Sequence, residues 1–390
     1  MYLLENPTRS YAWGSRSVIA DLLGQPTSEH PQAELWIGAH PEHPSRLVGS
    51  RQDLRTHVAR DPHGTLGPTA AEAFGGTLPY LLKVLAVERP LSLQVHPDHR
   101  QAADGFAEES GTSSSERMFK DRSHKAELVF AVSDFAALSG FRDRAEAHAV
   151  FTLLARRMPG VRGFAEIENL LTATDDATAL RAACQFIARL DYAEVTAMIE
   201  CLAGSAENSQ DPSLAVAAGL AEQHPHDPAV LLTLLLRYVE LAPGEAHGVD
   251  PRTPHTYLRG TAIELTTCSD NTIRAGLTSK PVDVARFLDV LAYAPSTEAS
   301  LTARQISAVE RTYTTAYDEF ELGVVRLAPG ESVHWTPKPR TILVLDGKLT
   351  VTDGTGSTRL GRGDSVFVPA DCGDVEIGGD GIAVQATTGV

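Results

Sequence analysis

Polar residues that could bind a metal alternate with apolar ones along the segment Ser92-Leu93-Gln94-Val95-His96. Successive side chains of a β-strand point to opposite faces, so Ser92, Gln94 and His96 are expected on one face of this segment. Burying such a face costs free energy unless its polar groups bind a partner or a metal. Taken alone, the pattern favours a hydrogen-bonded structural histidine and glutamine over a metal site.

Two later segments add titratable groups. The first is His124-Lys125-Ala126-Glu127, directly before an apolar run, where Lys125 and Glu127 share one strand face. Alone, a charged trio of this kind is typical of a solvated loop. The second segment, residues 253–280, interleaves polar with apolar side chains, which indicates packed elements rather than flexible loops. Its candidate functional residues are His255, Tyr257, Glu264, Asp270, Asn271, Arg274 and Lys280.

Two imidazoles, one carboxylate and one carboxamide, from Gln94, His96, Glu127 and His255, form a reasonable ligand set for a divalent metal. With a single carboxylate the loaded site would keep net positive charge, which suits a Lewis acid that holds substrate oxygens and stabilises an enediolate. These residue types do not exclude iron as the metal, because two histidines and a carboxylate also form the iron site of non-haem oxygenases. The four cysteines form no CxxC pair, so a thiolate metal site is not expected.

Charge and composition limit the possible partners. The chain of 390 residues has a formal charge of −16, which makes nucleic acid an unfavourable partner and requires a local basic pocket for any anionic substrate. No run approaches the roughly 18 apolar residues of a membrane span. The first residues show no basic cap before an apolar stretch, so no signal peptide is expected and a cytoplasmic location is the default.

The organisation of the chain predicts several units, because single cores stop growing at about 250–300 residues. The first 140 residues have the turns and short apolar runs typical of strands with a few short helices. Between Asp143 and Leu241 the pattern becomes helical, with one apolar stripe formed by Leu180, Ala183, Cys184, Ile187 and Leu190. The last helix is expected to begin at Asp227-Pro228 and to include AVLLTLLLRYVEL.

The C-terminal part reads as short antiparallel strands. The sequence LAPGE occurs at residues 241–245 and again at 327–331, which suggests two related β-units that each begin after a tight turn. A hairpin turn is expected at Asp346-Gly347. Strands at this spacing favour a jelly roll or cupin barrel. The C-terminal unit contains His334 without a second histidine in an HxH pair, so it is expected to bind no metal.

In four blocks the chain resembles type I mannose-6-phosphate isomerases. The blocks are YAWGS with AELWIGAHPEHPS (11–15 and 33–45), LPYLLKVLAVERPLSLQVHPD (78–98), SHKAELVFAVSDFAALSGF (123–141) and TPHTYLRGTAIELTTCSDNTIRAGLTSK (253–280). Ser123 and Ala126 stand where the family usually has asparagine and proline, and Thr256 stands where it usually has alanine. None of these three positions is expected to bind metal.

The resemblance implies a mainly β fold with an α-helical insertion. A cupin or jelly-roll barrel would hold the metal site, a second cupin-like barrel without metal would lie at the C-terminus, and a helical domain would lie between them. The corresponding domain limits are 1–142 and 241–300 for the catalytic cupin domain, 143–240 for the helical insertion and 301–390 for the C-terminal domain. The resemblance also implies one Zn²⁺ per chain, bound by Gln94, His96, Glu127 and His255.

The implied reaction interconverts mannose 6-phosphate and fructose 6-phosphate through a cis-enediol, with a proton moved between C1 and C2. Arg274 would neutralise the enediolate or the phosphate, and either Lys125 or Glu264 would move the proton. His124 could help to open the sugar ring. Contacts to the substrate are expected from Ser92, Tyr257, Asp270 and Lys280, and the lysine would complete a positive pocket in an acidic protein.

Two other classes of function stay open from the residues. A cupin oxygenase would use the same histidines and glutamate with iron, although nothing at Gln94 favours it. The other class is a binding or regulatory protein that kept the fold and lost catalytic turnover. The intact set of Lys125, Glu264 and Arg274 argues against this second class. A monomer or weak oligomer is expected. The pair His224 and His226 lies beside Pro225 and is interpreted as a solvated turn, and His99 is also interpreted as a turn residue.

Overall fold

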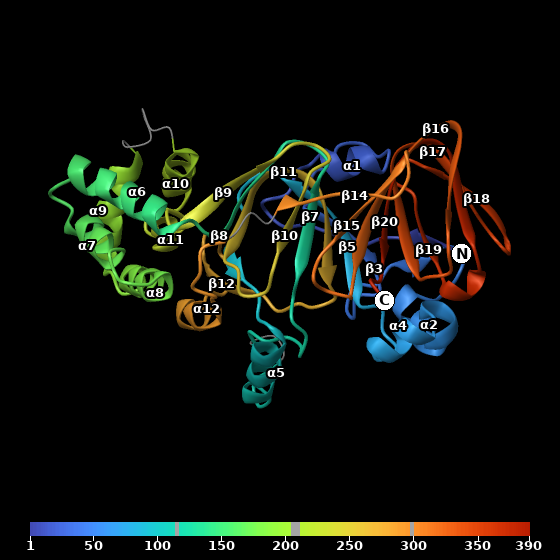
Figure 1. The fold of residues 1–390 in the computed structure, drawn as a ribbon, viewed down its shortest axis with the longest axis horizontal. Coiled ribbons are helices and arrows are strands. Elements are labelled where there is room, and N and C mark those ends of the chain that lie inside the picture. The colour runs from blue at the N-terminus through green and yellow to red at the C-terminus, as the bar shows by residue number, and fades with distance from the viewer. Residues whose placement is uncertain (114–116, 204–210, 297–299) are drawn as a thin grey trace.

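The chain folds into two β-sheets that stand next to each other, with a group of helices at one end (Figure 1). The computed structural model describes residues 1–113, 117–203, 211–296 and 300–390. The predicted domain limit at residue 300 adjoins positions 297–299, which lie outside the described residues. The fold is mainly β with a helical insertion, as the sequence predicts, but the strand pairings of the described residues do not close either sheet into a barrel.

The eleven-stranded sheet is built around one long strand, β11. Residues 260–267 of β11 lie between β5 and β7, whereas its first residues pair with β6 and β8. Between the two halves, Gly260 has φ +112, and a Cβ there would lie 2.4 Å from the carbonyl oxygen of Asp134, so the bend requires glycine. The strands of this sheet are β2 (Thr8–Arg9), β3 (Glu34–Gly38), β5 (Tyr80–Val87), β6 (Leu93–Val95), β7 (Glu127–Ala131), β8 (Phe135–Phe141), β9 (Leu236–Leu241), β10 (Ala246–Val249), β11 (His255–Thr267), β12 (Ile273–Gly276) and β13 (Ser300–Leu301).

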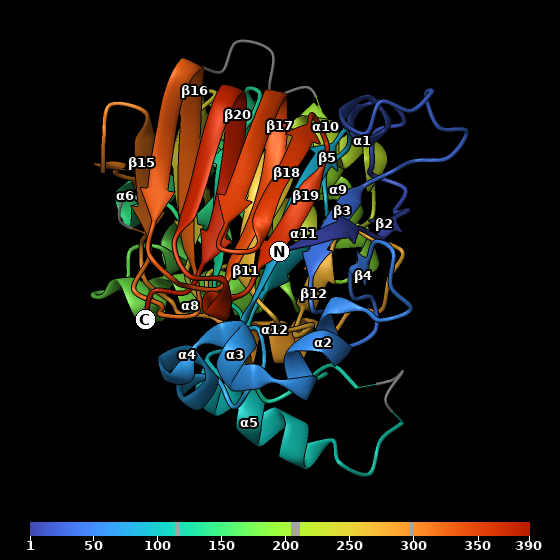
Figure 2. The same ribbon diagram turned by 90° about the vertical axis from the view of Figure 1, so that its right-hand side faces the viewer.

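The nine-stranded sheet contains the C-terminal strands together with the first strand of the chain. Tyr2 of β1 pairs with Phe367 of β19, so the two ends of the chain meet in one sheet. Figure 2 shows this sheet face on, with α2, α3 and α4 at its lower end. Its strands are β1 (Tyr2–Glu5), β4 (Arg46–Leu47), β14 (Arg304–Gln305), β15 (Glu310–Thr314), β16 (Glu321–Trp335), β17 (Arg340–Asp353), β18 (Gly356–Gly361), β19 (Ser365–Val368) and β20 (Val375–Thr387).

One apolar core joins the two sheets. It combines Leu82 and Ile263 of the eleven-stranded sheet with Phe367 and Val384 of the nine-stranded sheet, all fully buried. Apolar area removed from water stabilises a fold by roughly 25 cal/mol per Å², so a shared core of this kind holds the sheets in one relative position.

Most of the longer helices lie in the insertion. Helices α6 to α11 form the insertion at one end of the molecule. The stripe predicted on α8 is confirmed for Leu180, Ala183, Cys184 and Ile187, which are buried in the core of the insertion, whereas Leu190 lies beyond the end of the helix. The helices are α1 (Val18–Leu22), α2 (Leu54–Arg60), α3 (Pro62–Leu66), α4 (Pro68–Ala73), α5 (His99–Glu108), α6 (Arg144–Arg157), α7 (Arg162–Leu170), α8 (Asp176–Ile187), α9 (Tyr192–Ala203), α10 (Pro212–Gln223), α11 (Ala229–Thr233), α12 (Val284–Val290) and the 3₁₀ helix Ala370–Cys372. No helix of the described residues has the length and apolarity to cross a bilayer.

The prediction of one helix through AVLLTLLLRYVEL is wrong in its second half. Helix α11 ends at Thr233, and residues 236–241 form β9, which pairs with β8. A short apolar run fits a buried helix or a buried strand equally well, and here the free edge of β8 decides in favour of the strand. The predicted start is also one residue early, since Pro228 is the N-cap and Ala229 the first helical residue. Asp227 Oδ1 accepts from the amide of Ala229, and its Oδ2 accepts from the amide of Leu277.

The hairpin predicted at Asp346-Gly347 is also wrong. Strand β17 continues through both residues with a register shift after Val344, and the chain turns only between β17 and β18. Gly347 has φ +80, and a Cβ there would lie 2.2 Å from the carbonyl oxygen of Asp380. The glycine thus permits a close approach of two backbones at a bulge instead of a reversal of the chain.

The two LAPGE segments adopt the same local turn. In the first, the Glu245 carboxylate accepts from the amide of Ala242 at 2.9 Å, and in the second, Glu331 accepts from the amide of Ala328 at 2.8 Å. Each turn has its glycine at positive φ, which glycine adopts without steric cost. The first turn joins β9 to β10, whereas the second is a bulge inside β16.

Candidate metal centre and active site

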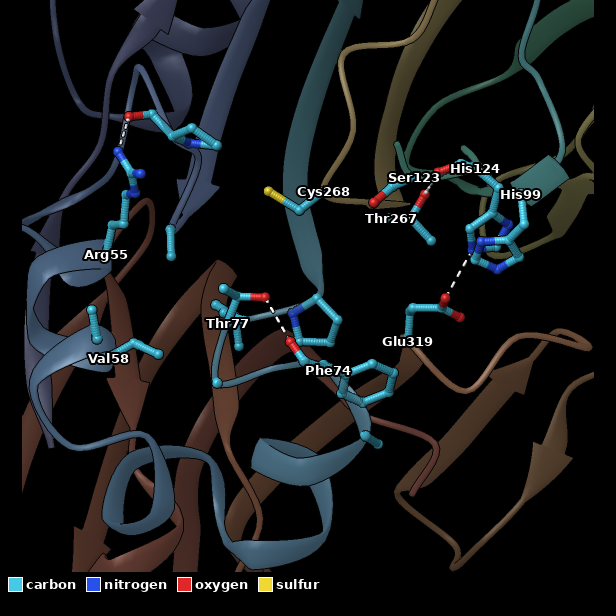
Figure 3. A pocket seen from close by; sticks show the side chains of 17 residues that line it. Arg55, Val58, Phe74, Thr77, His99, Ser123, His124, Thr267, Cys268 and Glu319 are labelled. Atoms are coloured by element: carbon cyan, nitrogen blue, oxygen red, sulfur yellow. Dashed lines mark hydrogen bonds and ion pairs between the residues drawn. The ribbon is translucent and has the colours of Figure 1, made fainter. Parts of the chain in front are cut away.

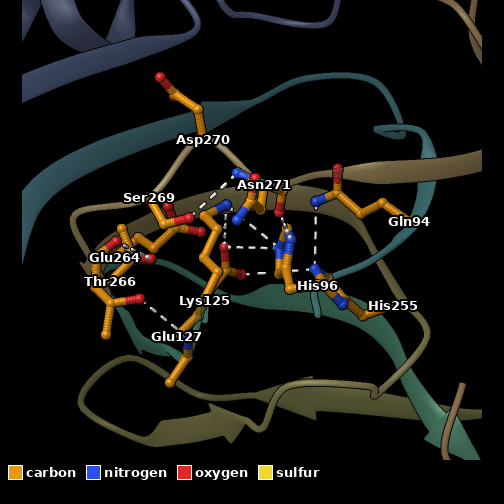
Figure 4. Close-up of polar contacts among 12 residues, drawn as sticks. Gln94, His96, Lys125, Glu127, His255, Glu264, Thr266, Ser269, Asp270 and Asn271 are labelled. Carbon is orange, nitrogen blue, oxygen red and sulfur yellow. Dashed lines mark hydrogen bonds and ion pairs between the residues drawn. The ribbon is translucent and has the colours of Figure 1, made fainter. Parts of the chain in front are cut away.

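His96, Glu127 and His255 form a buried cluster on the eleven-stranded sheet (Figure 4). Their ligand atoms all lie within 4.8 Å of one another. Glu127 Oε1 lies 3.1 Å from Nε2 of His96, and Glu127 Oε2 lies 3.6 Å from Nε2 of His255. The three residues come from the end of β6, the start of β7 and the start of β11, so the strand pairing brings them together.

Both histidines of this cluster direct Nε2 toward Glu127 and hold their other ring nitrogen on the backbone. Nδ1 of His96 donates to the carbonyl oxygen of Asn271 at 2.7 Å, and Nδ1 of His255 donates to that of Thr253 at 2.9 Å. Burial lowers the pKa of His96 to about 3 and lowers that of His255 below its ordinary value. Neutral imidazoles with a fixed tautomer present their Nε2 lone pairs as metal ligands.

Gln94 supplies the amide of the predicted ligand set. It pairs directly with His255 across β6 and β11, and its side-chain amide lies 3.2 Å from Nε2 of His255. A 180° rotation of the amide places its oxygen on the same side, because the two ends of a carboxamide are equivalent in shape. Ser92 Oγ donates to Gln94 Oε1 at 3.4 Å. Two imidazoles, a carboxylate and an amide oxygen fit a zinc ion that is bound by nitrogen and oxygen.

Two further side chains hold Glu127 in place. The Lys125 ammonium lies 2.7 Å from Glu127 Oε1, and the Tyr257 hydroxyl donates to Oε2 at 2.8 Å. Burial acts to raise the pKa of Glu127, but Lys125 and the two imidazoles hold this pKa well below its usual value. The structure thus places Tyr257, predicted to contact substrate, against a candidate metal ligand.

Lys83 and Glu264 form a second buried pair beside the cluster. They lie opposite each other on β5 and β11, and Lys83 Nζ is 2.8 Å from Glu264 Oε2. Burial and the nearby Glu127 carboxylate raise the pKa of Glu264 to about 7. Sequence reasoning missed Lys83, although a single charge inside the apolar run LPYLLKVL was a usable signal: buried charges need partners.

A cavity next to the cluster has a basic end. The guanidinium nitrogen Nε of Arg274 is buried without a hydrogen-bond partner in the part of the chain that the structure describes. Lys280 Nζ lies 3.8 Å from the ring centroid of Tyr11. Burial lowers the pKa of both basic groups. A nearby anion would favour their charged forms. The cavity is lined by Tyr11, Trp13, Glu34, Trp36, Lys83, Ser92, Gln94, Lys125, Glu127, Tyr257, Glu264, Asp270, Arg274 and Lys280, among others.

The loop between β11 and β12 positions the segment before β7. The Asn271 side chain accepts from the amides of Lys120 and Asp121 and donates to the carbonyl oxygens of Asp121 and Ser123. Asn271 is fully buried, so these bonds fix the approach of the chain to Lys125. The neighbouring Asp270 lies in the cavity wall, and its carboxylate is 3.1 Å from Nε2 of His40.

His124 does not reach this cavity. It points to the opposite side of its segment from Lys125, and its Nε2 lies 2.8 Å from Glu319 Oε1. Neighbouring side chains of an extended segment point to opposite faces. Because Lys125 and Glu127 face the candidate metal centre, the preceding His124 faces away from it. The structure therefore does not support a role for His124 in opening the sugar ring. It brings the residues expected to bind metal, move the proton or contact substrate to the one cavity or cluster, whereas Asn271 lies outside it and positions the segment before β7.

The fold and the site together define a cupin-like protein with a metal centre beside a basic cavity. Residues 1–144 match the family model described as phosphomannose isomerase type I, catalytic domain, and residues 323–373 match a cupin domain. The chain is 32% identical to the mannose-6-phosphate isomerase of Escherichia coli (strain K12), over 98% of each chain. It is 30% identical to the mannose-6-phosphate isomerase of Homo sapiens, over 95% of this chain and 94% of that one.

A solved structure agrees over the whole length. Mannose 6-phosphate isomerase from Salmonella typhimurium, in a crystal structure bound to its substrate fructose 6-phosphate and zinc, superimposes with a TM-score of 0.91 at 30% identity and covers 100% of both chains. The chain belongs to the mannose-6-phosphate isomerase family.

The Lys83–Glu264 pair generates a prediction about stability. Lys83→Met leaves the Glu264 carboxylate buried without its cation, and we expect a loss of about 3–5 kcal/mol where that carboxyl is ionised. The folded-state pKa of Glu264, about 7, lies above its ordinary value, so the folded protein binds more protons than the unfolded chain as the pH falls. The loss should be larger at about pH 8 than at about pH 6, measured by denaturant unfolding.

The matched control is Lys348→Met, which removes an exposed lysine from β17. We expect this variant to unfold like the wild type at both pH values. An equal loss of stability at both pH values for Lys83→Met would contradict the assigned ion pair.

Proposed function

We propose that this protein interconverts D-mannose 6-phosphate and D-fructose 6-phosphate, with one catalytic zinc ion per chain held by Gln94, His96, Glu127 and His255. One observation supports this proposal most. Two buried, neutral imidazoles and one carboxylate lie directly beside a cavity with basic groups that have no carboxylate partner among the described residues. A loaded centre of this kind supplies Lewis acidity toward the sugar oxygens. Membership of the mannose-6-phosphate isomerase family supports the same reaction.

The basic end of the cavity suits the anionic parts of substrate and transition state. Arg274 is assigned to the phosphate or to the charge that develops on the enediolate, since its guanidinium is buried without a carboxylate partner among the described residues. Lys280 extends the same positive region. A fixed cation in a site that excludes water stabilises developing charge more strongly than it would in solvent. This local field meets the need for a basic pocket in a chain whose formal charge is −16.

Glu264 fits the proton-transfer base better than Lys125 does. Its pKa of about 7 places the carboxylate near the best value for accepting and returning a proton at neutral pH. The Lys125 ammonium instead lies 2.7 Å from Glu127 and 3.3 Å from His96, so it is engaged with candidate ligands. In the forward direction the base takes the proton from C2 of the open-chain aldose and returns it to C1, through a cis-enediol.

Other side chains are assigned to positioning. Tyr257 holds Glu127 through its hydroxyl, and Ser92 and Asp270 lie in the cavity wall, where they can contact sugar hydroxyls. The oxygenase and the non-catalytic alternatives explain less, because neither requires unpaired basic groups and a carboxyl with a pKa near 7 in one cavity. A cytoplasmic location and a monomeric or weakly oligomeric chain stay predictions of the sequence.

Metal removal tests the proposal directly. In a coupled assay with mannose 6-phosphate, we expect turnover to disappear after chelation and to return when zinc is added, because the substrate oxygens would lose their Lewis acid. Metal content measured in parallel should follow the activity. A folded, zinc-loaded protein without turnover would refute the proposed reaction.

Arg274→Ala should lower kcat/KM by at least about 100-fold, which is the usual effect of removing a fixed group that stabilises transition-state charge. Zinc content should stay unchanged, because Arg274 pairs with Gln94 only through the backbone of β12 and β6, and its side chain donates to the carbonyl oxygen of Thr272. Arg286→Ala on α12 is the control, since this arginine pairs with Glu108 on the surface and should leave turnover unaltered. Retained activity in Arg274→Ala would remove the residue from the mechanism.

Exchange of the C2 hydrogen with solvent separates the two candidate bases. We expect Glu264→Gln to abolish exchange, because an amide cannot accept the proton, whereas Lys125→Met should slow turnover but leave exchange detectable. Zinc content should be measured in both variants, since Lys125 contacts Glu127. The opposite result, with exchange lost only in Lys125→Met, would assign the base to Lys125.

A further inference from the structure

A second group of potential metal ligands lies outside the central centre. His99, His124 and Glu319 place their ligand atoms within 4.8 Å of one another. His124 Nε2 is 2.8 Å from Glu319 Oε1, and the rings of His99 and His124 stack with centroids 3.8 Å apart. Figure 3 shows the three side chains gathered on one side of a pocket.

Three separate parts of the fold supply this group. His99 is the first residue of α5, His124 precedes β7, and Glu319 lies in the loop between β15 and β16 of the nine-stranded sheet. None of them lines the cavity beside the central centre. The segment before β7 therefore faces two clusters, with Lys125 on one side and His124 on the other.

The chemistry of this group suits a divalent transition metal. Two imidazoles and one carboxylate are preferred ligands of zinc and of its neighbours in the first row. His124 is buried, and the Glu319 side chain is only 19% exposed, whereas His99 is exposed at the edge. Burial and the neighbouring His124 lower the pKa of His99, and its place at a helix N-terminus also disfavours the imidazolium. A neutral His99 imidazole and an ionised Glu319 carboxylate are both in the protonation state that binds a cation.

The pocket next to the group leaves room for the rest of a coordination sphere. It has a volume of about 470 Å³, and its walls include Val58 and Phe74 as well as Arg55 on the far side from the histidines (Figure 3). Three protein ligands at one wall would leave the remaining positions of a metal facing this space, where water could complete the shell.

We propose that His99, His124 and Glu319 form a second site for a zinc-type divalent cation. His99 follows the candidate ligand His96 by three residues, and His124 precedes the candidate ligand Glu127 by three, so the site links both ligand-bearing segments to a loop of the nine-stranded sheet. A cation bound only by the folded state stabilises it by mass action. Occupancy of this second site thus stabilises the arrangement of both segments against the C-terminal sheet.

The test is the zinc stoichiometry of the full-length protein, measured by equilibrium dialysis and elemental analysis at free zinc of up to about 100 µM. We expect the wild type to bind two zinc ions per chain and the variants Glu319→Gln and His99→Asn to bind one each. In both variants the rise of the melting temperature with added zinc beyond the first equivalent should also disappear. The separation of the group from the central cavity predicts that mannose 6-phosphate turnover at one equivalent of zinc is unchanged.

The control variant is His334→Asn. His334 also lies near a carboxylate, 3.6 Å from Glu376, but it belongs to no group of three potential ligands among the described residues, so this variant should bind two zinc ions. A wild type that binds a single zinc ion, or variants of His99 and Glu319 that bind as many as the wild type, would overturn the second site. If Glu319→Gln does not fold, His99→Asn decides alone, because His99 is exposed at the start of a helix.

Discussion

The buried carboxylate of Glu127 is the interaction on which the centre depends. A carboxylate removed from water is costly unless opposite charges and hydrogen-bond donors surround it. Here it lies beside the Lys125 ammonium, the Tyr257 hydroxyl and two imidazole rings, which come from β6, from β11 and from the segment before β7. Contacts from three segments fix the position of this carboxylate, and neighbouring groups that orient a ligand in this way support metal binding.

The bend of β11 makes this arrangement possible. Its first residue, His255, faces Gln94 on β6, and its second half places Glu264 opposite Lys83 on β5. Gly260, with its positive φ, lies between these two halves, where a side chain would collide with the backbone of Asp134.

The acidic chain places two basic side chains, Arg274 and Lys280, together in the wall of the cavity beside the cluster. The surface charge of −16 repels polyanions at long range, whereas the cavity presents Arg274 and Lys280 in partly desolvated positions. Burial without a carboxylate partner is unfavourable in the free protein. A phosphate supplies the missing negative charge, so its binding removes this cost and gains the corresponding free energy.

Local sequence determined much of this protein. The alternation of Ser92, Gln94 and His96 identified one polar strand face, and the stripe on α8 identified a buried helix, because side-chain period depends only on backbone geometry. The family resemblance of the four blocks located Glu127, His255 and Arg274. Only the tertiary structure decided that residues 236–241 are a strand, that β1 joins the C-terminal sheet and that His124 faces Glu319. Those features depend on partners far away in the chain: a free strand edge, a second sheet and a loop of that sheet cannot be read from neighbouring residues.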